Sequence, residues 1–294
     1  MPKHKLLAWP FVLLQHVLPK HLLTALVFQI AGIRTKSIKN FLIRRFVRIY
    51  KVDVEEAGLP VPDGYPSFND FFTRQLADGA RSIDNGAKSI ISPIDGIVSA
   101  CGNIDSGMLL QAKGSHYSLS DLLMTDIKDT ERFSNGSFAT LYLAPHNYHR
   151  VHCPLSATLV AARYVPGALY SVNPTTVSLL PNLFTRNERL ICHFDSDAGP
   201  IIVILIGALH VGSISTPWTG QIRPRHKGVV QDIDIHQHGY PTEVNKGDLL
   251  GWFNMGSTVI ILLPPGAGGF SFDLGPGDNV RMGQAIGRIT PESS

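Results

Sequence analysis

A glycine followed by a serine near the carboxyl end of the chain has the most specific chemical potential. Gly256 and Ser257 lie in Asn254-Met-Gly-Ser-Thr258, directly before the apolar run Val259–Leu263. The serine oxygen can attack the preceding carbonyl, which glycine leaves open because it has no side chain. If the resulting ester breaks by elimination, Ser257 becomes a pyruvoyl group, an electrophilic carbonyl made from the chain itself. Gly-Ser-Thr is also a common turn, so the tripeptide alone leaves both interpretations open.

An aspartate in a second segment could support such a reaction. Asp95 lies in Ser92-Pro-Ile-Asp-Gly-Ile-Val98, where Asp-Gly precedes a β-like run. One interpretation is a buried carboxylate that orients a histidine. The alternative is an ordinary turn, which is the commoner use of an isolated Asp-Gly pair before a strand.

Three histidines at intervals of three residues form a dense group of possible proton carriers. They are His146, His149 and His152, in Leu143-Ala-Pro-His-Asn-Tyr-His-Arg-Val-His-Cys-Pro154. In a helix, the last two would share a face and suggest zinc, but the flanking prolines leave little room for a helix and no HExxH motif is present. The other interpretation is an extended or turn segment aimed into a pocket, with one histidine as base and another as proton donor. A solvated polar loop is less consistent with so dense a cluster.

A third segment suggests a site for an amphiphilic ligand. Gly, Asn and Pro in Gly167-Ala-Leu-Tyr-Ser-Val-Asn-Pro174 predict a mobile loop, and a cationic stretch follows at Leu183–Arg189. An ordinary loop with solvated charges is the alternative. The candidate substrate-binding residues are Tyr148, Val165, Leu169, Tyr170, Ser171 and Arg186.

Composition indicates a folded protein with reduced thiols. The chain has 294 residues, of which 44% are hydrophobic and 17% charged, enough for a substantial core and against disorder. Its three cysteines, Cys101, Cys153 and Cys192, are far apart and form no CxxC pair. This usage favours a cytosol-facing protein and argues against a zinc site built from cysteine.

The positive charge is concentrated at the amino terminus. Residues 1–51 contain ten Lys or Arg and no Asp or Glu, whereas the remaining 243 residues hold 16 basic and 23 acidic side chains. The sequence therefore predicts a cationic module joined to a mildly acidic body. No recognised nucleic-acid motif follows the basic stretch, so a nucleic-acid partner is not expected.

Apolar side chains share this cationic module. The runs Leu6–Leu14 and Leu22–Ile33 are each too short to span a bilayer, and neither is followed by the cleavage site of a secretory signal. Ser37–Tyr50 shows helical spacing, with Ile38, Leu42, Phe46 and Ile49 on one face beside several arginines. We expect amphipathic helices that lie on an anionic membrane. A helical hairpin packed on the core, with a solvated basic face, is the alternative.

The body of the chain has the pattern of an antiparallel β domain. Short β-like runs occur at Gly96–Ala100, Phe138–Leu143, Ala157–Val165, Ile201–Ile206 and Val259–Leu263. Before them, Ser67 and Asp70 have the spacing of a capped helix start. We expect an α+β protein whose mostly antiparallel, sandwich-like or barrel-like β domain follows the amphipathic helices. We expect residues 1–64 to form the membrane-association region and connector, and residues 65–294 to form the catalytic domain.

One motif occurs twice. Val244-Asn-Lys-Gly-Asp-Leu-Leu-Gly-Trp-Phe253 and Val280-Arg-Met-Gly-Gln-Ala-Ile-Gly-Arg-Ile289 share the spacing of their Val, Gly and apolar positions. The pattern suits short strands joined by tight glycine turns, as in biotinyl and lipoyl carriers. Those carriers need a lysine in an exposed hairpin, and none follows Phe253.

Together these segments resemble the phosphatidylserine decarboxylase family, of the bacterial proenzyme type. The resemblance covers about Tyr65–Ile289. Its motifs are Ser92-Pro-Ile-Asp-Gly96, Tyr148-His-Arg-Val-His152, Ser171-Val-Asn-Pro174, Phe184-Thr-Arg-Asn-Glu-Arg189 and Gly247-Asp-Leu-Leu-Gly-Trp-Phe-Asn-Met-Gly-Ser-Thr-Val-Ile260. The usual Leu-Gly-Ser-Thr appears here with Met255, which conserves volume.

The resemblance implies two reactions at one place. In self-cleavage, Asp95, His152 and Ser257 act as a charge relay that cuts between Gly256 and Ser257. This leaves a 1–256 β chain and a 257–294 α chain that begins with the pyruvoyl group. In catalysis, this group forms a Schiff base with phosphatidylserine, His149 donates a proton, and phosphatidylethanolamine and CO2 result, without pyridoxal phosphate or metal.

The resemblance also implies partners and a location. The two chains would form an αβ heterodimer that itself dimerises, peripheral to the cytoplasmic face of the inner membrane. Two alternatives remain. One is a serine hydrolase that uses Ser257, His152 and Asp95 without processing, although the GxSxG elbow is missing. The other is a membrane-attached, carrier-like scaffold without chemistry.

Overall fold

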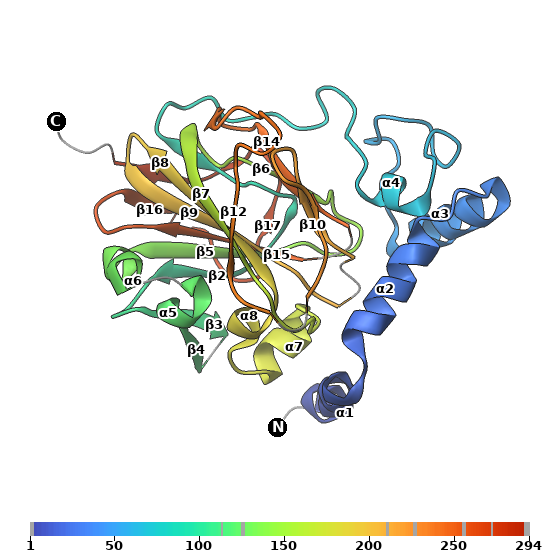
Figure 1. Ribbon diagram of the computed structural model, residues 1–294, viewed down its shortest axis with the longest axis horizontal. Helices are drawn as coiled ribbons and strands as arrows, with labels where there is room; N and C mark the ends of the chain where they lie inside the picture. The colour runs from blue at the N-terminus through green and yellow to red at the C-terminus, as the bar shows by residue number, and fades with distance from the viewer. Residues whose placement is uncertain are drawn as a thin grey trace.

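The computed structural model describes residues 3–112, 114–124, 127–209, 212–225, 228–254, 257–271 and 273–290. Gly256, one half of the expected cleavage site, lies outside the described residues. Three helices, α1 (Lys3–Val17), α2 (Lys20–Ala31) and α3 (Lys36–Tyr50), extend along one side of a β-rich body (Figure 1). The predicted α+β class and the order of helices before strands are confirmed.

Helix α3 confirms the helix expected at Ser37–Tyr50, but its apolar residues divide between two environments. Leu42 and Phe46 pack on a buried cluster that includes the phenylalanines of the short helix α4 (Phe68–Phe72), and the ring centroid of Phe46 lies 5.1 Å from that of Phe68. Ile38 and Ile49 remain exposed. The face that the sequence predicts as a single apolar surface is therefore partly used to anchor α3 on the body.

The start of α4 follows the predicted capping pattern. The Ser67 side chain accepts a hydrogen bond from the amide of Asp70 at 3.2 Å, and its hydroxyl donates to the Asp70 carboxylate at 2.7 Å. This cap satisfies a backbone donor that a helix of five residues would otherwise leave free. It fixes a helix whose side chains reach the candidate site described below.

Within the described residues, nine strands form one antiparallel sheet at the centre of the body. Its order is β12-β7-β8-β9-β15-β5-β2-β17, and β13 also pairs with β7. The bounds are β2 (Gly96–Asn103), β5 (Ser137–Tyr142), β7 (Ala157–Val165), β8 (Arg189–Ser196), β9 (Gly199–Ile206), β12 (Gln231–Ile233), β13 (Glu243–Val244), β15 (Thr258–Leu263) and β17 (Asn279–Val280). All five strands expected from the sequence are present.

Smaller sheets and short helices complete the body. A four-stranded sheet has the order β11 (Gly220–Ile222), β10 (Ile214–Thr216), β14 (Leu249–Phe253), β6 (Arg150–His152). The others are β1 (Ser89–Ile91), β18 (Ala285–Ile289) and β16 (Gly268–Phe270), and the pair β3 (Met108–Ala112) and β4 (Ser115–Ser118). The remaining helices are α5 (Leu119–Leu123), α6 (Ile127–Phe133), α7 (Pro174–Leu179) and α8 (Leu183–Arg186).

Strand β15 is a fully buried inner strand of the large sheet. All six of its residues are buried, and it pairs with β5 on one side and β9 on the other. A side chain on Gly251 of β14 would meet the Leu205 side chain of β9 at 3.5 Å, so the four-stranded sheet packs closely on this region. Ser257, the residue directly before β15, is also buried.

The repeated motif corresponds to a repeated structure. Each copy consists of a two-residue strand, a turn and a longer strand, β13 then β14 in the first and β17 then β18 in the second. Gly247 and Gly283 occupy the same position in the two turns, with φ of 89° and 88°. Only glycine adopts such values without strain, which explains its place in both copies.

Candidate active site

Ser257 occupies an interior position at the end of the central strand. It is fully buried, and its backbone carbonyl accepts a hydrogen bond from the amide of Leu143 at 3.0 Å. Its hydroxyl oxygen has no hydrogen-bond partner among the described residues. A buried hydroxyl without a partner carries a desolvation cost that structural residues usually avoid.

The chain just before the expected cleavage site is fixed by side-chain hydrogen bonds. The Asn254 amide nitrogen donates to the hydroxyls of Ser213 and Ser215 at 2.6 and 3.0 Å. Its oxygen accepts from the Asn69 amide of α4 at 2.9 Å. Asn254 and Ser257 are thus held by different elements on the two sides of the expected cleavage site.

His152 has both ring nitrogens occupied. Nδ1 lies 2.7 Å from the carbonyl oxygen of Gly247, and Nε2 lies 2.9 Å from the hydroxyl of Tyr148. Because a carbonyl oxygen can only accept, Nδ1 carries the proton and Nε2 of the neutral ring is the basic nitrogen. Burial lowers the pKa of His152, against a smaller opposing effect of the Gly247 hydrogen bond. The ring is therefore a neutral base near pH 7.

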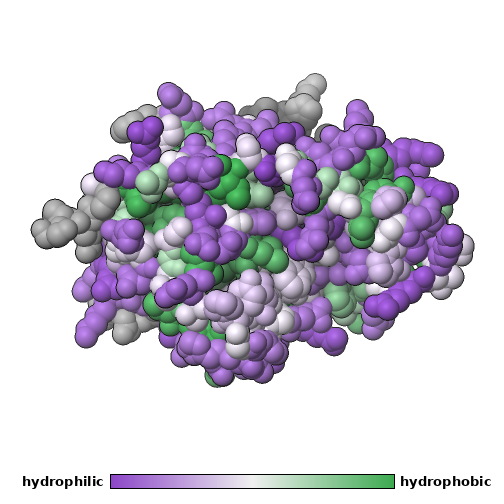
Figure 2. Space-filling view, turned by 90° about the horizontal axis from the view of Figure 1, so that it is seen from above, coloured by the Kyte–Doolittle hydropathy of each residue, from purple (hydrophilic) through white to green (hydrophobic). Residues whose placement is uncertain are grey.

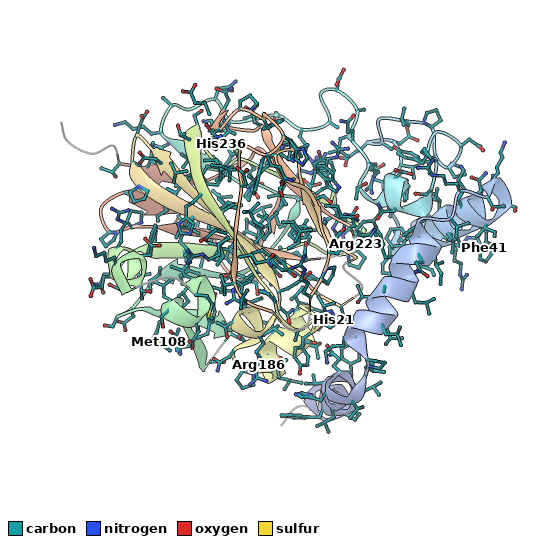
Figure 3. All side chains as sticks on the ribbon, in the orientation of Figure 1. His21, Phe41, Met108, Arg186, Arg223 and His236 are labelled. Atoms are coloured by element: carbon teal, nitrogen blue, oxygen red, sulfur yellow. The ribbon has the colours of Figure 1, made fainter. Side chains whose placement is uncertain are left out.

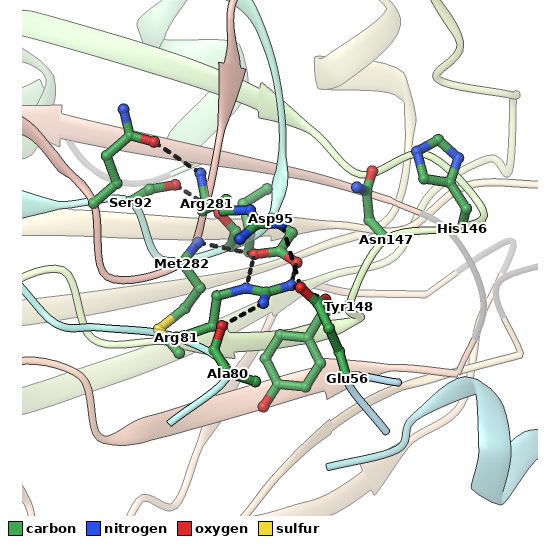
Figure 4. Close-up of polar contacts among 12 residues, drawn as sticks. Glu56, Ala80, Arg81, Ser92, Asp95, His146, Asn147, Tyr148, Arg281 and Met282 are labelled. Carbon is green, nitrogen blue, oxygen red and sulfur yellow. Dashed lines mark hydrogen bonds and ion pairs between the residues drawn. The ribbon is translucent and has the colours of Figure 1, made fainter. Parts of the chain in front are cut away.

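Asp95 is held by an arginine and a backbone amide. Both of its oxygens accept from the guanidinium of Arg81, and Oδ1 also accepts from the amide of Met282 at 2.9 Å (Figure 4). Glu56 binds the same guanidinium at 2.7 Å. The resemblance implies that Asp95 orients the imidazole of His152, but in this structure the Gly247 carbonyl occupies Nδ1. The negative charge of Asp95 still acts on His152 through space and raises its pKa slightly.

The segment that carries Asp95 is nevertheless joined to the histidine. The amide of His152 donates to the carbonyl oxygen of Pro93 at 2.8 Å. Ser92 stabilises the same turn, because its hydroxyl donates to the carbonyl oxygen of Ile94 at 2.7 Å. The aspartate and histidine segments, 57 residues apart along the chain, therefore form one local unit.

His149 lies in a more enclosed environment than His152. It is fully buried, and its ring stacks on Phe72 of α4 with centroids 4.0 Å apart and planes inclined by 27°. Burial, followed by the charge of Arg74, lowers the pKa of His149 to about 3. Nδ1 has no partner in the described part of the chain, and Nε2 lies 3.4 Å from the Pro145 carbonyl oxygen. The imidazole is neutral here, with one nitrogen free.

Arg74 is a buried cation that the sequence analysis did not identify. It is 4% exposed, and only one of its nitrogens has a partner, the carbonyl oxygen of His146 at 3.4 Å. Nε and Nη1 have none within the described ranges. Arg74 lines a cavity of about 300 Å³ together with Asp95, His146 and Tyr148. Such a cation is suited to an anionic ligand.

Comparisons with known proteins identify relatives of this chain. A family profile described as phosphatidylserine decarboxylase matches residues 68–288, and a second, described as PSD, matches residues 10–51. A phosphatidylserine decarboxylase proenzyme of Methylococcus capsulatus is 45% identical over 94% of this chain and 96% of its own length. Proenzymes of the same name from Hahella chejuensis and Alcanivorax borkumensis are 43% and 44% identical, over 95% and 96% of this chain and 93% and 97% of their own.

The chain belongs to the phosphatidylserine decarboxylase family. It is an enzyme of the carboxy-lyase class, as expected from the motifs. The profile match begins at Phe68, the first residue of α4, and so includes the helix that contacts His149 and Asn254. Among the described residues, no group of three or more His, Cys, Asp or Glu side chains is arranged to hold a metal ion.

The expected mobile loop at Gly167–Pro174 leads directly into a helix. Asn173 caps helix α7 by accepting from the amide of Thr176 at 2.8 Å, and Pro174 is the first helical residue. Val165 and Leu169 are buried, whereas Arg186 is exposed at the end of α8 (Figure 3). The structure does not bring Arg186 into the cavity that Arg74 lines.

Tyr170 and Ser171 contact the amino-terminal helices. The amide of Ser171 donates to the Gln15 side chain of α1 at 2.8 Å, and the ammonium of Lys20 lies 4.4 Å from the centroid of the Tyr170 ring. Asn187 holds the other side of this segment through two hydrogen bonds to the backbone of Tyr170, at 2.9 and 2.8 Å. The segment is therefore fixed between the helices and the β domain.

The amino-terminal helices of this decarboxylase expose an unusual share of its apolar side chains. Of the 18 exposed large apolar side chains in the described residues, 12 lie on α1–α3, among them Val17 at 78% and Phe41 at 66%. Phe41 points away from the body, and green patches lie between hydrophilic side chains at the end of the molecule where α3 and α4 lie (Figures 2 and 3). Within the described chain, no single helix is long and apolar enough to span a membrane. The helices Trp9–Val17 and Lys20–Ala31 are long and apolar enough only when they are taken together, and they are bent by 91° relative to each other.

Proposed function

We propose that this chain is the proenzyme of a pyruvoyl-dependent decarboxylase that converts phosphatidylserine to phosphatidylethanolamine and CO2 in phospholipid biosynthesis. The observation that carries the proposal is the buried hydroxyl of Ser257 directly before β15, which has no hydrogen-bond partner among the described residues. It follows Gly256 in the sequence of a chain whose relatives are named proenzymes. An unprocessed serine hydrolase is disfavoured because Ser257 does not lie in a GxSxG motif.

Self-cleavage requires a base for the Ser257 hydroxyl. We assign this role to Nε2 of His152, which is the unprotonated nitrogen because Nδ1 donates to the Gly247 carbonyl. The charge of Asp95 stabilises the imidazolium that forms, without a direct hydrogen bond in this structure. The Tyr148 hydroxyl is hydrogen-bonded to the same nitrogen. It must therefore move away from Nε2, or relay the proton, when Ser257 reacts.

The residues present fit a pyruvoyl group. Ser257 provides the atoms from which it forms, and the surrounding strands exclude water from it. The group supplies a ketone that condenses with the substrate amine and accepts the electron pair released when CO2 leaves. No pyridoxal phosphate is required for this chemistry.

The two fragments would remain associated. Cleavage before Ser257 assigns β15–β18 to the smaller fragment, and β15 is paired along its length with β5 and β9 of the larger one. Separating them would expose six buried residues and two ladders of hydrogen bonds. An αβ heterodimer is therefore the functional unit that we propose.

Decarboxylation ends with protonation of carbon, and we assign the proton donor to His149. Its pKa of about 3 would leave it neutral at pH 7 in the empty site. An anionic substrate beside it raises this pKa, because a nearby negative charge favours the protonated ring. Arg74, which lowers the same pKa, would be partly neutralised by that substrate.

We propose that helices α1–α3 hold the enzyme on the cytoplasmic face of the membrane, where the substrate lies. The exposed apolar side chains would enter the interface, and the cations of residues 1–51 would contact anionic headgroups. The contact between Gln15 and Ser171 joins this surface to the candidate substrate segment.

Three variants test the proposal. Ser257→Ala is expected to give an uncut and inactive chain, because the nucleophile is missing. His149→Ala is expected to give two fragments but little CO2 from phosphatidylserine vesicles. If His149→Ala instead prevents cleavage while His152→Ala does not, the two histidines have the opposite roles.

A further inference from the structure

Glu188 is a buried carboxyl group that none of the steps above uses. It is 1% exposed, and its Oε2 accepts a hydrogen bond from the Tyr164 hydroxyl at 2.6 Å. Its other oxygen, Oε1, accepts no hydrogen bond from any described residue. A carboxyl group with one fixed and one free oxygen is costly in a core, where an apolar residue would be more stable. The presence of this free oxygen in the core therefore indicates a function.

Strand pairing aligns Glu188 with Ser257. Ile206 of β9 lies opposite Arg189 of β8 and opposite Thr258 of β15. Continuing both registers by one residue sets Glu188, Gly207 and Ser257 side by side across the sheet. The amide of Gly207 donates to the Glu188 carbonyl at 2.9 Å, which supports the first of these pairings.

Gly207 leaves open the space between the two side chains. A β-carbon on Gly207 would lie 2.5 Å from Oε1 of Glu188, so the free oxygen is on the face to which a side chain at 207 would point. Side chains opposite each other in antiparallel strands share a face, with β-carbons about 5 Å apart. The free oxygen therefore lies within about 8 Å of the Ser257 β-carbon, on the same face of the sheet.

The reaction at this position needs a group that binds and deprotonates an amine. The amino group of phosphatidylserine is an ammonium in neutral water, and it has no electron pair with which to attack a carbonyl. A carboxylate oxygen forms a strong charge-assisted hydrogen bond with an ammonium and can accept its proton. His152 and His149 are assigned to other steps, so the amine requires a further base.

We propose that Glu188 binds the ammonium group of the substrate through Oε1 and takes one of its protons, and this inference rests on the function proposed above. One N–H bond breaks, its electron pair stays on the nitrogen, and the proton forms an O–H bond on Glu188. The condensation releases one water, and the proton leaves with it. Glu188 then returns to the carboxylate form, so protons and charge balance over the cycle.

The surroundings of Glu188 suit a base that works near neutrality. Burial raises its pKa to about 7, while the Tyr164 hydroxyl and the backbone amide of Arg225 oppose that increase. The carboxyl is thus ionised in part of the molecules at neutral pH, and the acid form can return its proton. The Arg225 amide also donates to the Tyr164 hydroxyl at 3.0 Å, which holds the tyrosine in place.

Glu188→Gln tests this role, because glutamine keeps the size of the side chain and can still accept from Tyr164. The variant is expected to self-cleave normally. Its condensation with phosphatidylserine, trapped by borohydride and followed by mass, should slow by at least about a hundredfold. Reaction with hydroxylamine, whose nitrogen is unprotonated at neutral pH, should slow far less. Equal slowing of both amines would indicate a structural role only and would overturn the proposal, as would an unchanged rate with phosphatidylserine.

Two further variants complete the test. Glu243→Gln, an exposed glutamate on β13, should leave both rates unchanged. If Glu188→Gln does not mature, Tyr164→Phe is used in its place, because it removes the hydrogen bond that fixes Glu188. This variant should react more slowly than the wild type with phosphatidylserine but not with hydroxylamine. A rate with phosphatidylserine equal to that of the wild type would overturn the role of Glu188. Wild-type protein that forms neither a hydroxylamine adduct nor CO2 would contradict the proposed function itself, whereas an active wild type with an equally fast Glu188→Gln contradicts this inference alone.

Discussion

The Nδ1 atom of His152 lies 2.7 Å from the carbonyl oxygen of Gly247, so a backbone group selects the protonated nitrogen of this imidazole. Gly247 has a φ of 89° and belongs to the turn before β14. The same strand ends one residue before Asn254, which leads to the expected cleavage site. The turn that orients the base and the strand that leads to the cleavage site are therefore one element.

This relationship predicts a distinct effect of a substitution at Gly247. A β-carbon there would meet the Ile83 side chain at 2.4 Å, and the positive φ is strained for other residues. Gly247→Ala should shift the carbonyl and slow self-cleavage, with a loss of unfolding free energy of about 1–3 kcal/mol. Gly266→Ala is the matched control for φ, because Gly266 has a φ of 82° and no atom near its β-carbon position. Equal cleavage rates in the two variants would show that the Gly247 carbonyl does not orient His152.

Arg81 is predicted to be as important for stability as for the site. It is almost fully buried and binds both Asp95 and Glu56. Arg81→Met leaves the Asp95 carboxylate buried without its partner and should lower the free energy of unfolding by about 3–5 kcal/mol, measured in urea. Arg281→Met, at an exposed side chain that also contacts Glu56, should cost less than about 1 kcal/mol. Similar losses in the two variants would contradict the buried ion pair.

Phe72 is predicted to affect decarboxylation without preventing cleavage. Its ring covers His149, so Phe72→Leu should admit water and raise the pKa of the imidazole toward its ordinary value. We expect two normal fragments and a loss of about 1 kcal/mol in stability. The kcat for CO2 release should fall, because the imidazole loses the ring that holds it in position and this loss outweighs the effect of the raised pKa. Phe41→Leu, on the exposed face of α3, should leave kcat unchanged in detergent. A kcat equal to the wild type in Phe72→Leu would contradict the role given to this stacking.

The pH dependence of self-cleavage follows from the lowered pKa of His152. The neutral imidazole is the active base, so the rate should fall only as the pH drops below the ordinary histidine value of 6.5. Above that value the His152 limb should be flat. The measurement is the rate of fragment formation after denatured proenzyme is refolded in buffers of different pH. A midpoint clearly above 6.5 would indicate a raised pKa, as a direct hydrogen bond to Asp95 would cause, and would contradict the structure.

Membrane attachment should depend on charge as well as on apolar contact. Replacing Arg44, Arg45 and Arg48 with Gln removes three cations from the exposed side of α3. Each contributes about 1 kcal/mol at most, so affinity for anionic vesicles should fall by roughly ten- to a hundredfold. Binding to uncharged vesicles should change little. Unchanged cosedimentation with anionic vesicles would favour the alternative of a solvated basic face.

The strands and the start of α4 could be predicted from the sequence because their signals are local. Apolar runs between Gly and Pro turns identified β15, and the spacing of Ser67 and Asp70 identified the cap of α4. The division of α3 into an exposed and a packed face could not be predicted. The division depends on the phenylalanines of α4, and the spacing of the apolar residues within α3 carries no information about them.

The groups that contact the site residues could not be predicted from the sequence either. The group that orients His152 is a backbone carbonyl, and no residue type marks it. Phe72, which stacks on His149, and Arg74, whose charge acts on it, lie 77 and 75 residues earlier in the chain. Glu188 lies in a quoted motif, but a glutamate between Asn and Arg suggests solvent exposure. Only the alignment of β8, β9 and β15 sets it across β9 from Ser257, on the same face of the sheet.

The most direct measurement is the mass of the purified protein under denaturing conditions. We expect two fragments, residues 1–256 and 257–294, with the smaller one lighter by one ammonia than a fragment that begins with serine. A single chain of 294 residues, or a smaller fragment with a free amino-terminal serine, would contradict the formation of a pyruvoyl group at position 257.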